Sequence, residues 1–165
     1  MDIGNALLTF SQLALGLAGF SAILVALSGR PHLWTPVDSF RIKNMLTFAF
    51  EAVFLSLVPF VLAFFAISES VLWRISLVVL AAATLGGTLL VLGRFTRLSQ
   101  SERAVLRPSL VYGNVAILCA ASLFEVVAAL GIVGTAPGVF FTGLLLLLGV
   151  AVFLVVRFLF ARPSA

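Results

Sequence analysis

Long apolar runs without charged residues constrain this chain more than any other feature of its sequence. No residue is charged between Asp2 and Arg30, and none from Val139 to Val156. A helix needs roughly 20 mainly apolar residues to cross the hydrocarbon core of a bilayer. Of the 165 residues, 62% are hydrophobic and 10% are charged, whereas a soluble domain carries about 25% charged residues. The sequence therefore predicts an all-α, polytopic bundle of transmembrane helices.

Caps, prolines and charges predict where the spans begin and end. Thr35, Pro36 and Asp38 are typical of the N-cap, the first position and the acidic first turn of a helix. Pro108 marks a second start in the same way, and Pro59 predicts a kink within a span. Five spans result, at about residues 6–28, 37–66, 71–93, 109–132 and 138–157 of a single transmembrane domain, 1–165.

The basic residues predict an orientation for these spans. Five spans place nine of the ten Lys and Arg residues at one end of the bundle and Arg74 at the other. Because short cytoplasmic links are enriched in Lys and Arg, we expect that end and the C-terminus in the cytoplasm, with the N-terminus outside. The nine should fix this orientation or contact lipid headgroups; they are Arg30, Arg41, Lys43, Arg94, Arg97, Arg103, Arg107, Arg157 and Arg162. The net charge of +4 is thus explained without a nucleic-acid partner.

Glu51 is the most unusual residue of the predicted second span. It follows Arg41 by ten residues, about 15 Å along a helix, which is near the bilayer midplane. An ionised carboxylate there costs at least ~2.5 kcal/mol, so Glu51 should be protonated, paired or hydrated. Asn44 and Thr47 precede it by about two turns and one turn. We therefore predict a polar stripe that faces the bundle rather than lipid.

A second carboxyl group, Glu125, is predicted in the outer half of the fourth span. It follows Pro108 by 17 residues, about 25 Å along a helix, and shares a face with Asn114. Small and polar residues with helical spacing on two other spans would let neighbouring helices approach closely. They are Asn5, Thr9, Gln12, Gly16, Gly19 and Ala26 on the first span, and Thr84, Gly87 and Thr88 on the third.

Two interpretations of the polar residues remain open. In the first, an ion or small solute passes along a seam lined by Glu51, Glu125, Asn44, Thr47, Asn114 and Gln12, with the carboxyl groups as proton or cation sites. In the second, these groups only stabilise helix contacts in a structural or accessory subunit of a membrane complex. Under either interpretation the lipid bilayer is the immediate partner, and we expect a homo-oligomer or a larger membrane complex.

The sequence contains no catalytic or metal-binding motif that we could identify. HExxH, GxSxG and phosphate-binding loop patterns do not occur, and the single His32 and single Cys119 fall on different predicted elements. One cysteine also cannot form an intrachain disulfide. We therefore expect no enzymatic activity, no cofactor and no metal.

Two features hint at ancestry. Phe50-Glu51-Ala52-Val53 recurs as Phe124-Glu125-Val126-Val127, which suggests duplicated hairpins like the parallel repeats of transporters, or a chance match.

A resemblance to other proteins is carried by three segments within about the first 60 residues. They are Leu17-Ala18-Gly19-Phe20-Ser21-Ala22-Ile23, Trp34-Thr35-Pro36-Val37-Asp38 and Phe40-Arg41-Ile42-Lys43-Asn44. This part of the chain resembles a group of small bacterial multi-pass membrane proteins. The resemblance implies the bacterial inner (plasma) membrane and brings no known activity.

Overall fold

The computed structural model describes residues 3–27, 35–133 and 135–160. These residues form six helices and no strand. Five helices are long and apolar enough to cross a membrane, and the short α4 is the exception. The helices are α1 (Ile3–Leu27), α2 (Pro36–Ala63), α3 (Glu69–Thr96), α4 (Gln100–Leu106), α5 (Pro108–Ala129) and α6 (Ala136–Phe160). The prediction of an all-α fold with five membrane-spanning helices is confirmed.

Helices α2 and α5 begin at the capping residue and the prolines that the sequence predicts. The Thr35 hydroxyl accepts a hydrogen bond from the Asp38 backbone N–H at 3.2 Å, and the Asp38 carboxylate accepts one from the Thr35 backbone N–H at 3.4 Å. This capping box satisfies backbone donors that would otherwise be unpaired at the helix start. Pro108 occupies the first turn of α5. Pro59 lies inside α2, which continues to Ala63.

A short helix, α4, occupies the link between the predicted third and fourth spans. Ser99 and Glu102 form a second capping box, in which the Ser99 backbone N–H donates to Glu102 Oε2 at 2.8 Å. Hydrogen bonds from the Ser99 hydroxyl and backbone lower the pKa of Glu102. Arg107, with φ of 55°, is both the last cap of α4 and the first cap of α5. The left-handed backbone at Arg107 lets the two helices follow each other directly.

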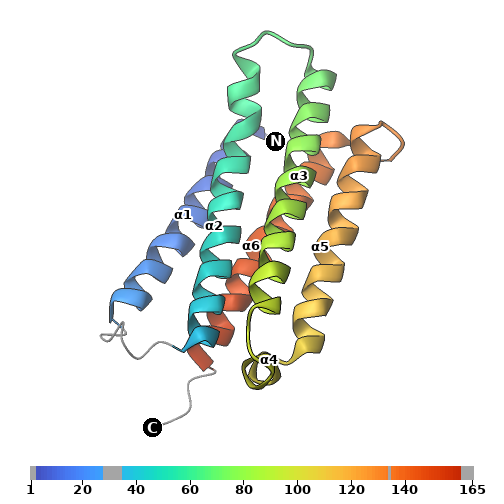
Figure 1. The fold of residues 1–165 in the computed structure, drawn as a ribbon. Coiled ribbons are helices and arrows are strands. Elements are labelled where there is room, and N and C mark those ends of the chain that lie inside the picture. The colour runs from blue at the N-terminus through green and yellow to red at the C-terminus, as the bar shows by residue number, and fades with distance from the viewer. Residues whose placement is uncertain (1–2, 28–34, 134, 161–165) are drawn as a thin grey trace.

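The helices pack around a centre made by α2, α3 and α6. In Figure 1, α6 runs behind α2 and α3, α1 flanks α2, and α5 flanks α3. The most deeply buried side chains come from the central helices and are mainly apolar, among them Phe48, Leu77, Leu80, Phe140, Leu144 and Leu147. Because lipid tails are as apolar as leucine, close packing rather than hydrophobicity must hold these helices together.

The described basic residues gather at one end of the bundle, which we call the basic end. This is the end where α2 begins, α3 ends and α4 lies, at the bottom of Figure 1. It contains the arginines at 41, 94, 97, 103, 107 and 157 together with Lys43. Arg74 lies at the opposite end, beside Gly131 of the turn between α5 and α6. Arg30 and Arg162 lie outside the described residues, and which side of a membrane the basic end faces stays a prediction.

The face of α1 that was expected to receive a neighbouring helix is turned outward. Leu7, Ala14 and Ala18 face the core instead, while the predicted face is exposed from Asn5 through Thr9, Gln12 and Gly16 to Gly19. At Gly16 and Gly19 a Cβ atom would meet nothing within 4 Å among the described residues. Ala14 and Ala18 give α1 a second face with small residues, and helical spacing alone could not choose between the two faces.

Candidate functional site

The predicted polar stripe of α2 faces the bundle and is bound by a residue of α3. Asn44 is 1% exposed, and Thr47 and Glu51 are half-buried. Arg94 Nη1, in the last turn of α3, donates to Asn44 Oδ1 at 2.7 Å and to Thr47 Oγ1 at 3.0 Å. The Thr47 hydroxyl in turn donates to the Lys43 carbonyl at 2.7 Å. Arg94 therefore holds two side chains of the stripe, one helical turn apart, against α3.

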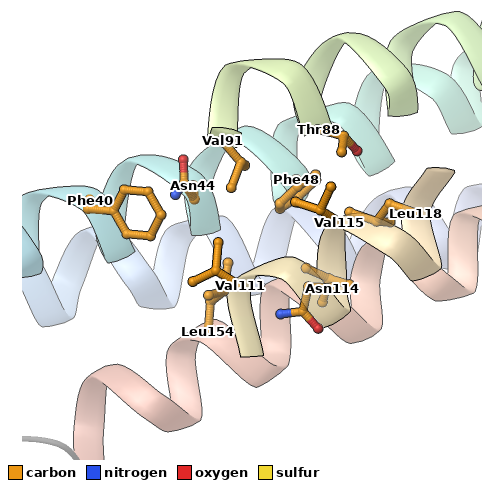
Figure 2. Close-up of a pocket in the computed structure, with 11 residues that line it drawn as sticks. Phe40, Asn44, Phe48, Thr88, Val91, Val111, Asn114, Val115, Leu118 and Leu154 are labelled. Carbon is orange, nitrogen blue, oxygen red and sulfur yellow. The ribbon is translucent and has the colours of Figure 1, made fainter. Parts of the chain in front are cut away.

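Arg94 also determines which way the Asn44 amide points. A guanidinium has only donors, so it must meet the amide oxygen, and Asn44 Nδ2 is left buried without a hydrogen-bond partner among the described residues. Asn44 lines a cavity of about 30 Å³ between α2, α3, α5 and α6, with Asn114 of α5 also in its wall (Figure 2). A water needs about 10–15 Å³ and polar partners. The cavity has room for one.

The Glu51 carboxyl group lies against the backbone of α3 at Gly87. A Cβ atom at Gly87 would lie 2.7 Å from Glu51 Oε2 and 2.9 Å from the carboxyl carbon, so the carboxyl group can hold this position only because residue 87 has no side chain. Oε2 is buried and has no hydrogen-bond partner among the described residues. The positive charge of Arg94 attracts the Glu51 carboxylate, but the two side chains form no ion pair among the described residues.

Glu125 is buried in a similar way between three helices. It is 2% exposed, and neither carboxyl oxygen has a hydrogen-bond partner in the described chain. A Cβ atom at Gly143 of α6 would lie 3.3 Å from the Glu125 carboxyl carbon and 2.7 Å from Cδ2 of Leu80 in α3. Glu125 of α5 thus sits where α3 and α6 come together.

One face of α3 connects the two carboxyl groups. Leu80, Thr84 and Gly87 recur at helical spacing on that face, so Glu125 lies at the level of Leu80 and Glu51 at the level of Gly87. These levels are seven residues apart, or about 10.5 Å along the helix. Between them lies Thr84, which is 1% exposed and whose hydroxyl has no hydrogen-bond partner among the described residues. The polar seam consists of Arg94, Asn44, Thr47, Glu51, Thr84 and Glu125.

The structure does not bring all the predicted residues into this seam. Gln12 is exposed on α1, and Asn114 is half-buried at the cavity wall, away from the line of the two carboxyl groups. Sequence reasoning did not single out Ser122, whose buried hydroxyl also lacks a partner in the described chain. It also did not identify Gly143 as the neighbour of Glu125. A small residue facing a carboxyl group on another helix leaves no signal that can be read from one chain.

The two Phe-Glu repeats have the same orientation on their helices. Phe50 and Phe124 are exposed, at 44% and 46%, while Glu51 and Glu125 each face a glycine of the next long helix. The two glutamates lie at different distances from the ends of their helices, because Glu51 precedes the end of α2 by 12 residues and Glu125 precedes the end of α5 by four. Duplication of the hairpins stays a hypothesis.

Removing the Arg94 guanidinium should loosen the contact between α2 and α3. In Arg94→Met, Asn44 Oδ1 and Thr47 Oγ1 lose their interhelical donor. Hydrogen bonds to charged groups contribute about 1.5–3 kcal/mol, and partial exposure of Arg94 places the expected loss in the free energy of unfolding near 1–2 kcal/mol. Arg97→Met is the matched control, since Arg97 is exposed. Equal stability of both variants in detergent unfolding experiments would contradict a structural role for these hydrogen bonds.

Neither a metal-binding cluster among the described residues nor a similar known protein helps to assign a function to the polar seam. Among the described residues, no group of three His, Cys, Asp or Glu side chains could hold a metal ion. Comparison of the chain with models of protein families, with curated proteins and with solved structures found no match.

Proposed function

We propose that this multi-pass membrane protein passes protons along the polar seam, as a channel or transporter subunit of the bacterial inner membrane. One observation carries the proposal: two intramembrane carboxyl groups and a hydroxyl lie along one face of α3, all with buried oxygens that lack hydrogen-bond partners in the described chain. Buried polar groups without partners are rare in folded proteins. Intramembrane Asp and Glu residues mark proton relays and ion pathways.

The spacing of the seam favours protons over metal cations or larger solutes. Cations such as Ca²⁺ or Mg²⁺ need about six or more oxygen ligands around one point, whereas the two carboxyl groups here are about 10.5 Å apart along α3. The carboxyl groups also lie against Gly87 and Gly143, so helix backbone closes one side of each group to the ligands of a hydrated ion. A proton needs only a chain of groups that both donate and accept hydrogen bonds.

The seam supplies most of such a chain. A water in the cavity beside Asn44 would lead from the basic end toward Glu51, and Thr84 lies between Glu51 and Glu125. Proton transfer requires heavy atoms about 2.6–3.2 Å apart, directly or through one water. The hydroxyl of Thr84 cannot cover the whole distance, so conduction requires waters that enter when α2 or α5 moves slightly away from α3.

A second candidate function, an accessory subunit, is favoured by the outer face of α1. Thr9, Gln12, Gly16 and Gly19 are exposed there, and small and polar residues are typical of contacts between transmembrane helices. In that case a second copy or another membrane protein would cover α1, and the carboxyl groups would serve packing. This candidate predicts that a membrane partner co-purifies with the chain.

Purified protein in liposomes should therefore conduct protons. A pH-sensitive dye inside the liposomes should report acidification, driven by a potassium diffusion potential, faster than in protein-free liposomes of the same lipid. Sodium and potassium flux, measured in parallel, should stay at the background rate because the two carboxyl groups lie too far apart along α3 to bind one cation together. Proton flux no faster than the background, from protein shown to be folded, would favour the accessory subunit instead.

A further inference from the structure

A hollow with three cations opens at the basic end, between the first turns of α2 and the last turn of α3. Its volume is about 250 Å³, and Lys43, Arg94 and Arg97 line it together with the hydroxyl of Ser39 and the ring of Phe40. No acidic residue lines it. Three positive charges converging on one hollow form a site for an anion with several oxygen atoms.

The nearby carboxylates are engaged elsewhere. Asp38 caps Thr35 and lies 3.9 Å from Arg41 Nη1, and Glu102 caps Ser99. No carboxylate of a described residue forms an ion pair with the three cations of the hollow. Lys43 and Arg97 therefore have no carboxylate partner among the described residues, and Arg94 has only its longer-range interaction with Glu51.

The position of the hollow matches the level of lipid headgroups. α2 has 28 residues and is about 42 Å long, whereas the hydrocarbon core is about 30 Å thick. Asp38, Arg41 and Lys43 lie in the first turns of α2, so this is the end that extends into the headgroup region. Leu98, which is half-buried, also lines the hollow and offers an apolar contact to an acyl chain beside the charged groups. An anion that is part of a lipid can use both kinds of contact, whereas a soluble anion can use only the charges.

We propose that this hollow binds the phosphate of an anionic phospholipid headgroup. Arg97 would bind two phosphate oxygens in the bidentate manner of a guanidinium, and Lys43 would add a point charge. Arg94 Nη1 already donates to Asn44 and Thr47, so Nε and Nη2 are the donors that remain for a ligand. The site does not depend on proton conduction, but through Arg94 it places a lipid directly at the end of the polar seam.

Native mass spectrometry of the whole protein can test this site with dioleoylphosphatidylglycerol as the probe and dioleoylphosphatidylcholine as the neutral reference. The wild type should retain the anionic lipid preferentially. Lys43→Gln and Arg97→Gln should each lower its affinity about fivefold, as expected for one cation near a lipid surface. Arg107→Gln is the matched control, since it removes one exposed cation from the same end outside the hollow.

Two results would overturn the proposal. If Arg107→Gln lowered binding as much as Arg97→Gln does, general surface charge rather than the hollow would hold the lipid. If excess inorganic phosphate displaced the lipid from the wild type, the ligand would be a soluble anion. Neither Lys43 nor Arg97 donates a hydrogen bond to another described side chain, so both variants should fold, and a melting curve in detergent can verify this.

Discussion

Glu125→Gln should reduce proton flux through the reconstituted protein to the background leak of the liposomes. Glutamine has nearly the volume of glutamate, so it can occupy the same space against Gly143, but its amide does not take up and release protons. A positioned proton-transfer group typically accelerates transfer by about 10²-fold or more. Because Glu125 is 2% exposed, no bulk water can replace it. Glu51 is half-buried, so Glu51→Gln should lower the flux less.

The control for both variants is Glu69→Gln. Glu69 is an exposed carboxyl group in the first turn of α3, outside the polar seam, and its loss should leave the flux unchanged. Each variant needs matched reconstitution and a melting curve, because an amide also adds two donors to a site without partners. A folded Glu125→Gln protein that conducts like the wild type would show that this carboxyl group serves packing alone.

Sequence patterns predicted the fold well because they report local physics. The charge-free runs define helices that can cross a bilayer, and Thr35, Pro36 and Asp38 define the start of α2 through groups that meet within one turn. α4 was not predicted, although Ser99 and Glu102 have the spacing of a capping box. Its seven residues are too few to show the periodicity of an amphipathic helix.

The seam could be predicted only where it depends on one helix. The stripe of Asn44, Thr47 and Glu51 follows from helical spacing, and the costly burial of a carboxyl group marks Glu51 and Glu125 as unusual. Which helix faces each carboxyl group depends on how the helices rotate against one another. On helices that are apolar nearly all round this rotation is decided by close contacts between small residues. Gly87 was predicted only as part of a close-packing face with Thr84 and Thr88, not as the neighbour of Glu51, and Gly143 could not be distinguished from other glycines of the chain.

Those two glycines also differ from each other in what a side chain would cost. At Gly87 an added methyl group would meet the end of the Glu51 side chain, which is half-buried and can move aside. At Gly143 it would meet Leu80 and Glu125 together, and these are 0% and 2% exposed. The carboxyl group of Glu51 can therefore yield to an alanine, whereas neither neighbour of Gly143 has space to do so.

Gly143→Ala should consequently lower the free energy of unfolding by about 1–3 kcal/mol, the usual cost of an extra methyl group in a packed core. Gly149→Ala is the matched control, because it lies on the same helix and a Cβ atom there meets nothing within 4 Å among the described residues. Adding Glu125→Ala to Gly143→Ala should recover part of the loss, with a coupling of at least about 0.5 kcal/mol, as for residues in contact. Additive effects in this cycle, measured by unfolding in detergent, would mean that Glu125 does not pack against Gly143. The seam would then lack the α6 contact that holds the Glu125 carboxyl group against α3.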